Sequence, residues 1–225
     1  MLPGPPIRLK CPNCGGHKYI QSIYSGNTFG GKQWSDTKND YPMLPNPSPV
    51  QHCPKCKGYY FYEDAKRKPL SYSLFESKKP YEEADKNGYG HLSFEQTNEA
   101  YDSLLTEELS DERKALLGIL WLFKYNDEYG GRYTQEKEAP EGILNKRKDV
   151  LQGLIQLHLE SNNNLFVAEL YRELGEFDKC IELASRAQEE GGFQAVVAEQ
   201  IIQHAKDEDA NVFEINMDSY GREQQ

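Results

Sequence analysis

The chain has 225 residues, of which 37% are hydrophobic and 28% charged, and its formal net charge is −10. This length suits one medium domain or two small ones, and no stretch approaches the roughly 20 apolar residues that a membrane helix needs. The N-terminal sequence "MLPGPPIRLK" also lacks the apolar run of a signal peptide, so we expect a cytoplasmic protein that does not associate with membranes.

Charge is distributed unevenly along the chain. Residues 1–68 contain ten Lys or Arg and four Asp or Glu, a net charge of +6, whereas residues 69–225 contain sixteen and thirty-two, a net charge of −16. This asymmetry predicts two units with different roles, of which only the first can attract a polyanion.

Four of the five cysteines occur in two C-P-x-C pairs near the N-terminus. In a cytosolic chain, such pairs indicate a metal site rather than disulfides. Four thiolates complete the tetrahedral shell of Zn²⁺ and leave no open position for a substrate, so we expect a structural zinc ion and no catalytic residue. The predicted ligands are Cys11, Cys14, Cys53 and Cys56.

Each cysteine pair lies between strand-like runs, "PIRLK" and "HKYIQSIY" around the first, "PVQH" and "YYFYED" around the second. The proline within each pair and the glycine one or two residues after it favour the tight turn that aims two sulfurs at one ion. The pattern predicts an antiparallel β zinc ribbon over residues 1–68, with a long loop at 25–50. His17 and His52 are interpreted as strand residues beside the site.

The loop contains "SGNTFGGKQWSD", which resembles a phosphate-binding loop up to Lys32. Gln33 stands where that motif requires Ser or Thr, and the following residues are a poor helix start, so we reject this interpretation. The glycines instead predict a loop held down by Trp34, Tyr41 and Met43. An alternative is that Trp34 and Asp36 form a recognition loop, because binding residues often lie on loops of a rigid scaffold.

Residues 69–93 are predicted to be a linker, which leads into a calcium-loop-like stretch at 85–96. Tyr89 and Gln96 replace two of the expected oxygen ligands, so a turn that leads into a helix is the better interpretation, and whether this stretch binds a cation is left open.

A helical period begins near residue 94 and predicts a helical domain over 94–207, followed by a polar tail at 208–225. Ser110 is an expected N-cap, the stretch at 132–142 an expected polar loop, and 193–206 a final helix. Residues 162–190 match a tetratricopeptide-like helical hairpin that turns near Gly175, in which Cys180 is a small packing residue rather than a nucleophile. The sequence contains no second hairpin of this kind about 34 residues earlier, which is the length of one tetratricopeptide repeat.

"SGNTF" followed by "WSD" and "PMLP" between two C-P-x-C pairs resembles an uncharacterised group of bacterial zinc-ribbon proteins. The "LWLF" helix and "ELYRELGEFDKCIELA" resemble a related bacterial family of unknown function, in which a ribbon precedes tetratricopeptide-like helices. The chain departs from these patterns at Thr37, where glycine is commoner, and at Cys180, where alanine is usual. The resemblance implies an α+β fold and zinc binding, but no reaction.

The sequence therefore predicts a non-enzymatic, zinc-binding protein–protein interaction module, whose helical domain offers a groove to a protein or peptide partner. The alternative is nucleic-acid binding by the basic, aromatic ribbon, since cations beside aromatic rings suit single strands. The five histidines are scattered and no nucleophile–base pair is apparent, so no activity or organic cofactor is expected. The residues predicted for the alternative are Lys10, Lys18, Lys32, Lys55, Lys57, Tyr19, Tyr59, Tyr60 and Phe61.

Overall fold

The computed structural model describes residues 1–70, 78–133, 137–159 and 163–217. The chain forms two compact units. The ribbon unit comprises Met1–Gly31 and Asp40–Glu107, and the helical unit comprises Lys32–Asn39 and Glu108–Gln225. Small antiparallel sheets precede helices along the chain, so the fold is α+β, as predicted.

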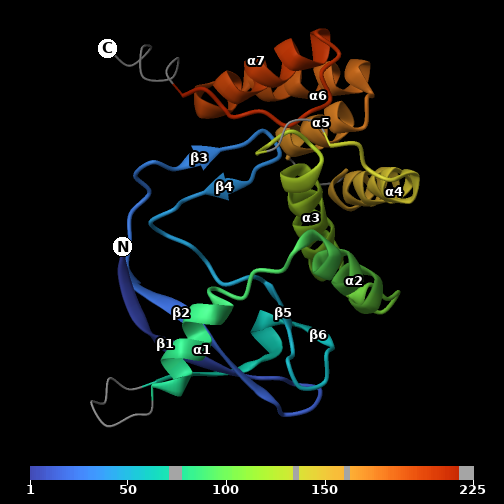
Figure 1. Ribbon diagram of the computed structural model, residues 1–225. Helices are drawn as coiled ribbons and strands as arrows, with labels where there is room; N and C mark the ends of the chain where they lie inside the picture. Colours follow the sequence, from blue (N-terminus) through green and yellow to red (C-terminus); the bar gives the residue numbers. More distant parts are fainter. Residues whose placement is uncertain (71–77, 134–136, 160–162, 218–225) are drawn as a thin grey trace. The chain divides into compact units, whose positions relative to one another are not determined.

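Strands β1 (Leu2–Lys10), β2 (His17–Ser25) and β7 (Lys66–Pro69) form an antiparallel sheet in the order β2-β1-β7 (Figure 1). A second pair, β5 (Val50–His52) and β6 (Tyr59–Phe61), is also antiparallel. Alternation along β1 directs Ile7 and Leu9 to the core with Ile20 of β2. Each cysteine pair thus joins two paired strands, as the sequence indicates, whereas β7 was not predicted.

The free edge of β2 is covered by helix α1 (Lys79–Asn87), which follows the short 3₁₀ turn Tyr62–Asp64 and strand β7 in the chain. The Tyr19 N–H donates to Glu83, the Tyr19 carbonyl accepts from the Asn87 amide, and the Gln21 N–H donates to the Gly88 carbonyl. Covering an edge in this way prevents it from pairing with another chain. The predicted linker at 69–93 therefore contains part of a strand and a helix that packs on the sheet.

Helix α2 (Phe94–Leu104) completes the ribbon unit and begins with a capping box between Ser93 and Gln96. Tyr59 of β6 donates a 2.7 Å hydrogen bond to Glu99 of α2, which fastens the helix to the ribbon. The stretch at 85–96 is thus the end of α1, a turn with positive φ at Gly88 and Gly90, and the start of α2. The helical domain predicted from residue 94 begins instead after Glu107.

The helical unit contains α3 (Asp111–Glu128), α4 (Glu141–His158), α5 (Asn164–Glu173), α6 (Phe177–Glu189) and α7 (Gly192–Lys206). Helices α5, α6 and α7 pack closely because small residues occupy their contact faces (Figure 1). Gly175, with φ of 82°, makes the left-handed turn between α5 and α6 where the sequence predicts one. The residues at this contact that are no more than 1% exposed are Ala168, Cys180, Ala184, Ala187, Ala198, Ile201 and Ala205.

Two segments that were not predicted to belong to the helical unit complete it. Strand β3 (Lys32–Gln33) pairs with β4 (Asn39–Asp40), and the Ile215 N–H donates to the Gln33 carbonyl. Val212 and Ile215 are each 7% exposed, so the part of the predicted polar tail up to residue 217 is docked; residues 218–225 lie outside the described part. No helix among the described residues is both long and apolar enough to cross a membrane.

Candidate metal centre

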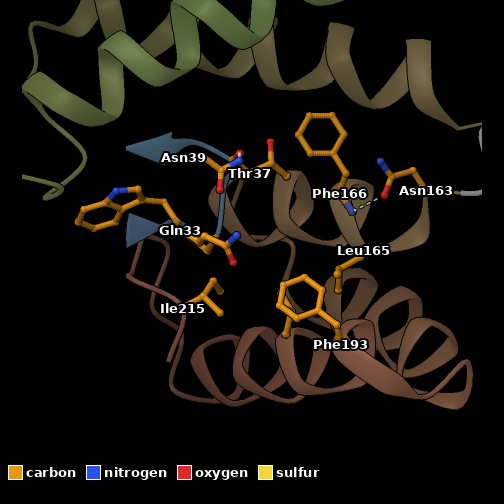
Figure 2. A pocket seen from close by; sticks show the side chains of 11 residues that line it. Gln33, Thr37, Asn39, Asn163, Leu165, Phe166, Phe193 and Ile215 are labelled. Carbon is orange, nitrogen blue, oxygen red and sulfur yellow. Dashed lines mark hydrogen bonds between the residues drawn. The ribbon is translucent and has the colours of Figure 1, made fainter. Parts of the chain in front are cut away.

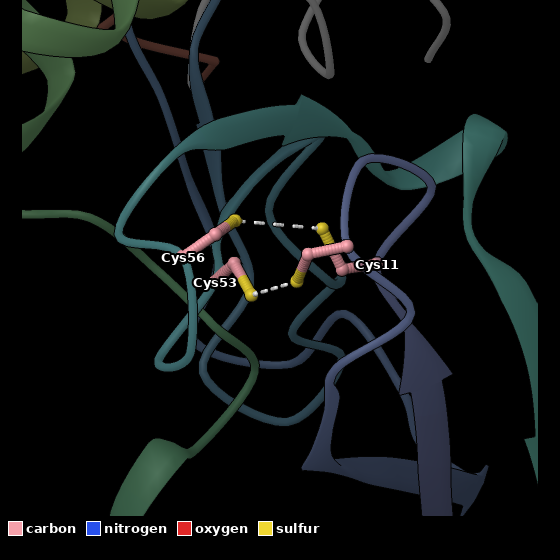
Figure 3. A group of neighbouring side chains, drawn as sticks. Cys11, Cys53 and Cys56 are labelled. Carbon is pink, nitrogen blue, oxygen red and sulfur yellow. Dashed lines mark hydrogen bonds between the residues drawn. The ribbon is translucent and has the colours of Figure 1, made fainter.

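The four predicted ligands meet in the ribbon unit, where their sulfur atoms all lie within 4.8 Å of one another. Cys11 Sγ lies 3.9 Å from Cys56 Sγ, and Cys14 Sγ lies 3.6 Å from Cys53 Sγ (Figure 3). A tetrahedron with Zn–S bonds near 2.3 Å requires sulfurs about 3.8 Å apart, whereas a disulfide would bring two of them to about 2.05 Å. The spacing therefore fits a four-thiolate metal site.

The two cysteine pairs form turns with the same backbone hydrogen bonds. In the first turn the Cys11 N–H donates to the Gly16 carbonyl and the Gly15 N–H to the Cys11 carbonyl. In the second turn the Cys53 N–H donates to the Gly58 carbonyl and the Lys57 N–H to the Cys53 carbonyl. Gly15 has φ of 69° and Lys57 has φ of 62°, so in the second turn a lysine takes the left-handed position that glycine was expected to take.

The thiols differ in how readily they ionise. Burial raises the pKa of Cys11 to about 11. Burial also opposes ionisation of Cys53, but the backbone N–H groups of Cys56 and Lys55, with the neighbouring thiols, lower its pKa to about 7. A bound divalent cation would favour all four thiolates, because metal ligation stabilises the deprotonated form.

Lys18 supplies a buried positive charge behind the second turn. Its side chain is 7% exposed overall, and its Nζ donates to the His52 carbonyl at 3.4 Å. Burial lowers the pKa of Lys18 to about 8, although Cys53 and Glu83 favour its charged form. Four thiolates around one Zn²⁺ carry a net charge of −2, which a nearby ammonium group partly offsets. This lysine was predicted to contact nucleic acid, but it is buried beside the site.

A small apolar core supports the cysteines. Cys11 and Cys53 pack with Leu9, Ile20 and Tyr60, all of which are nearly inaccessible to solvent. Burial, followed by the charges of the four thiols, raises the pKa of Tyr60, so its hydroxyl stays protonated. His17 and His52 stand at strand positions and do not belong to the sulfur cluster. The ligand shell is thus held by packing as well as by its turns.

Trp34 and Asp36, the candidate recognition residues, are placed inside the helical unit. Trp34 is 8% exposed, and its ring packs edge-on against the Tyr133 ring with the two ring centroids 5.7 Å apart. Asp36 is fully buried. The Asp36 carboxylate accepts hydrogen bonds from Arg132 and, at 2.9 Å, from Asn126. Both side chains therefore take part in packing, which was the other interpretation of this loop.

Asp36 belongs to a buried polar network that sequence reasoning missed. Asn126 also donates to Glu173 at 3.2 Å, and Arg147 donates to the same carboxylate at 3.3 Å. In this network Glu173 Oε1, Asn126 Oδ1 and Arg132 Nη1 are buried without a hydrogen-bond partner. The polar loop predicted around residue 132 contributes Arg132, which is only 5% exposed.

In the sequence, the feature that comes closest to indicating a buried polar network is a pair of charged residues on helix α5, Glu169 and Arg172, which lie among mostly apolar residues. Glu169 and Arg172 are both fully buried and form a two-pronged ion pair with hydrogen bonds of 2.6 and 2.8 Å. Arg172 also donates to Ser35 Oγ at 3.4 Å and to the Asp209 carbonyl. A charged pair three residues apart on a helix is normally solvated, so its burial could not be inferred without the neighbouring segments.

A cavity of about 190 Å³ opens in the helical unit beside strand β3 (Figure 2). Its walls are apolar or aromatic, its rim is formed by amide and hydroxyl side chains, and no charged side chain lines it. Thr37 lies on the rim with φ of 72°, an uncommon backbone angle for a β-branched residue. The lining residues are Gln33, Trp34, Ser35, Thr37, Asn39, Asn163, Leu165, Phe166, Phe193, Val197 and Ile215.

The cations and rings predicted for nucleic-acid binding do not all lie on one exposed surface. Lys32 belongs to the helical unit and pairs with Glu214 at 2.5 Å. Tyr59, Tyr60 and Phe61 are at most 8% exposed. The ribbon unit as the structure defines it contains eleven basic and eleven acidic residues, so the expected charge of +6 is not a property of the whole unit.

Comparison with protein-family models, with curated proteins and with solved structures gives no match. The geometry of the two units therefore carries the functional argument.

Proposed function

We propose that this chain is a non-enzymatic zinc-binding protein that acts as a protein–protein interaction module. The observation that carries the proposal is the set of four cysteine sulfurs within 4.8 Å of one another. A zinc ion bound by all four would have a complete tetrahedral shell, whereas catalytic zinc keeps one position for water or substrate. In this proposal the ion stabilises the ribbon and takes part in no reaction.

The cavity in the helical unit supports the interaction role. A cavity of about 150 Å³ in an apolar protein core can hold a benzene molecule, so about 190 Å³ suits one aromatic or large aliphatic side chain. Phe193, which lines the cavity, is 39% exposed, so apolar surface is accessible to a partner at this position. We propose that a partner inserts an apolar side chain here, while the polar rim accommodates the partner's backbone.

The negative net charge of the helical unit favours a partner that is positively charged. The helical unit contains fifteen basic and twenty-five acidic residues, a net charge of −10. Complementary charge accelerates association and disfavours acidic competitors. In the same proposal the α5–α6 pair is a tetratricopeptide-like hairpin, and the chain belongs with the uncharacterised bacterial zinc-ribbon proteins that its sequence resembles.

The metal is tested by elemental analysis of the purified protein. We expect one zinc per chain, lost in Cys53→Ser together with the dispersed amide signals of the ribbon unit in an NMR spectrum. Cys180→Ala is the matched control, because this cysteine lies in the helical unit, and it should retain the metal. Full order of the ribbon unit in metal-free protein would contradict the structural role.

The partner is tested with an array of lysine- and arginine-rich peptides that carry Phe, Leu or Ala at a central position. Binding should require Phe or Leu and should weaken at least tenfold in Phe193→Ser. Leu144→Ser is the matched control, because Leu144 is similarly exposed, at 41%, on helix α4 away from the cavity lining. Equal binding of the Ala peptides would contradict insertion into the cavity.

A further inference from the structure

The ribbon unit has a second feature, an exposed cationic face on its three-stranded sheet. In the register of this sheet Arg8 lies opposite Lys68, and Lys10 lies opposite Lys66. Leu9 and Ile20 project to the opposite face and form the core. Because side chains alternate along a strand, the four cations share one face, with neighbours about 5 Å apart across strands and about 7 Å apart along them.

This arrangement is electrostatically unfavourable by itself. Like charges directly opposite each other destabilise a strand pair, and here two such pairs are adjacent. None of the four cations forms an ion pair in the part of the chain that the structure describes. Lys10, Lys66 and Lys68 are exposed, and Arg8 is half-buried. A bound anion would remove the repulsion.

Protection of the sheet edge against pairing accounts for only two of the four cations, those on strand β7. Strand β7 is an edge strand, and Lys66–Pro69 is the kind of sequence that prevents edge-to-edge pairing. Arg8 and Lys10, however, lie on β1, the central strand, whose two sides are both paired. Their charge has no role in edge protection and increases the repulsion with β7.

Two rings stand beside the cations on the same face. In the register with β2, Tyr19 lies opposite Arg8, and His17 lies opposite Lys10. Tyr19 is half-buried and His17 is exposed. Cations that track a backbone, with rings that accept unstacked bases, are the means by which proteins bind single-stranded nucleic acid without sequence preference.

We propose that this face, Arg8, Lys10, Lys66 and Lys68 with Tyr19 and His17, binds single-stranded nucleic acid. The cations contact consecutive phosphates, and the rings stack on bases. A duplex is disfavoured because its bases are already paired and stacked, so they cannot stack on the two rings. The site goes beyond the proposed protein-binding role, since it lies in the ribbon unit and uses none of the cavity residues.

The proposal is tested by fluorescence anisotropy with labelled single-stranded RNA and DNA of about 12 nucleotides, a length within known site sizes. The full, zinc-loaded chain is titrated at several salt concentrations. We expect binding at low salt that weakens as salt rises, with a logarithmic slope of about −0.7 for each phosphate contact. A duplex of the same length should bind more weakly.

The test variant Lys66→Gln/Lys68→Gln changes two exposed residues of an edge strand. It should weaken binding at least tenfold and reduce the slope by about 1.4. The control Lys148→Gln/Lys206→Gln removes the same charge from exposed positions of the helical unit and should bind like the parent. Unchanged thermal unfolding of both variants would show that the fold is intact.

Three results would overturn the proposal: no binding of single strands at low salt, equal binding by the test and control variants, or binding of inorganic polyphosphate with none of the oligonucleotides. The last result would identify the face as a general polyanion site. Loss of peptide binding in Phe193→Ser concerns the cavity alone, so the two functions fail independently.

Discussion

Asp36 shows how a single side chain can hold a distant segment in place. Its fully buried carboxylate accepts hydrogen bonds from the side chains of Arg132 and Asn126. A buried charge is tolerated only when a partner of opposite charge and additional donors surround it. Its partners come from the end of α3 and the turn after it, almost a hundred residues later in the chain.

Replacement of Asp36 by alanine should therefore destabilise the helical unit strongly. Arg132 would lose its buried partner, which typically costs about 3–5 kcal/mol of unfolding free energy. The measurement is urea unfolding followed by tryptophan fluorescence. Asp149→Ala, which removes an exposed acid from α4, should cost less than about 0.5 kcal/mol. A similar small loss for Asp36→Ala would show that the ion pair contributes nothing.

Glu173 makes stability depend on pH. Burial, opposed by Arg147 and Arg172 but reinforced by Glu169 and Asp36, raises the pKa of its carboxyl from 4.5 to about 7. The folded state thus binds a proton more tightly than the unfolded chain, so this group's contribution to stability is lost as pH rises between about 4.5 and 7.

Glu173→Gln should remove this dependence. Its unfolding free energy relative to the parent should rise between about pH 5 and about pH 8, by an amount of the order of a few kcal/mol. Urea titrations at several pH values measure the difference, and Glu182→Gln, an exposed acid on α6, should show no such trend. A constant difference across the range would mean that Glu173 is ionised throughout.

At the scale of elements, small side chains determine how closely helices approach. Ala168 of α5 and Cys180 and Ala184 of α6 are all fully buried in the contact between these helices and α7. Burial raises the pKa of the Cys180 thiol to about 12, so the thiolate is scarce and the group is unreactive. The sequence interpretation of Cys180 as a packing residue agrees with this environment.

Size should therefore matter more than chemistry at position 180. We expect Cys180→Ala to cost less than about 1.5 kcal/mol, and Cys180→Leu to cost more, because extra methylene groups force closely packed helices apart. Thermal unfolding of the two variants provides the comparison. If Cys180→Leu were as stable as the parent, the contact between α5 and α6 would be looser than the structure shows.

At the scale of the whole molecule, the chain passes between its units in an unusual order. Residues 32–39 belong to the helical unit, although Cys14 and Cys53 on either side belong to the ribbon unit. A metal ion bound by these cysteines would close the loop that contains Trp34 and Asp36. Closing a loop reduces the entropy of the unfolded chain and so favours docking of the segment within it.

Removal of the metal should consequently weaken the helical unit as well as the ribbon. Both tryptophans, Trp34 and Trp121, lie in the helical unit, so their fluorescence reports on that unit alone. A chelator should lower the urea midpoint of this signal, and added zinc should restore it. The variant Cys180→Ala should respond as the parent does. An unchanged midpoint would show that the two units unfold independently.

The order of the elements was accessible from the sequence because it depends on local signals. Paired cysteines in proline- and glycine-containing turns, alternating runs beside them and a change to helical period near residue 94 predict an α+β chain with a four-sulfur cluster. The turn at Gly175 and the helix up to residue 206 follow from similar local patterns. These features require only neighbouring residues to act together.

Only the tertiary structure decided which distant segments share a unit. Residues 32–39 and 212–215 look like loop and tail in the sequence, yet they pair with each other beside the helices. The buried network of Asp36, Arg132 and Glu173 and the opposed cations on β1 and β7 likewise depend on pairings between residues 47 to 96 positions apart in the chain. A charged side chain looks the same in sequence whether solvated or buried, because its environment is supplied by parts of the chain that local patterns do not specify.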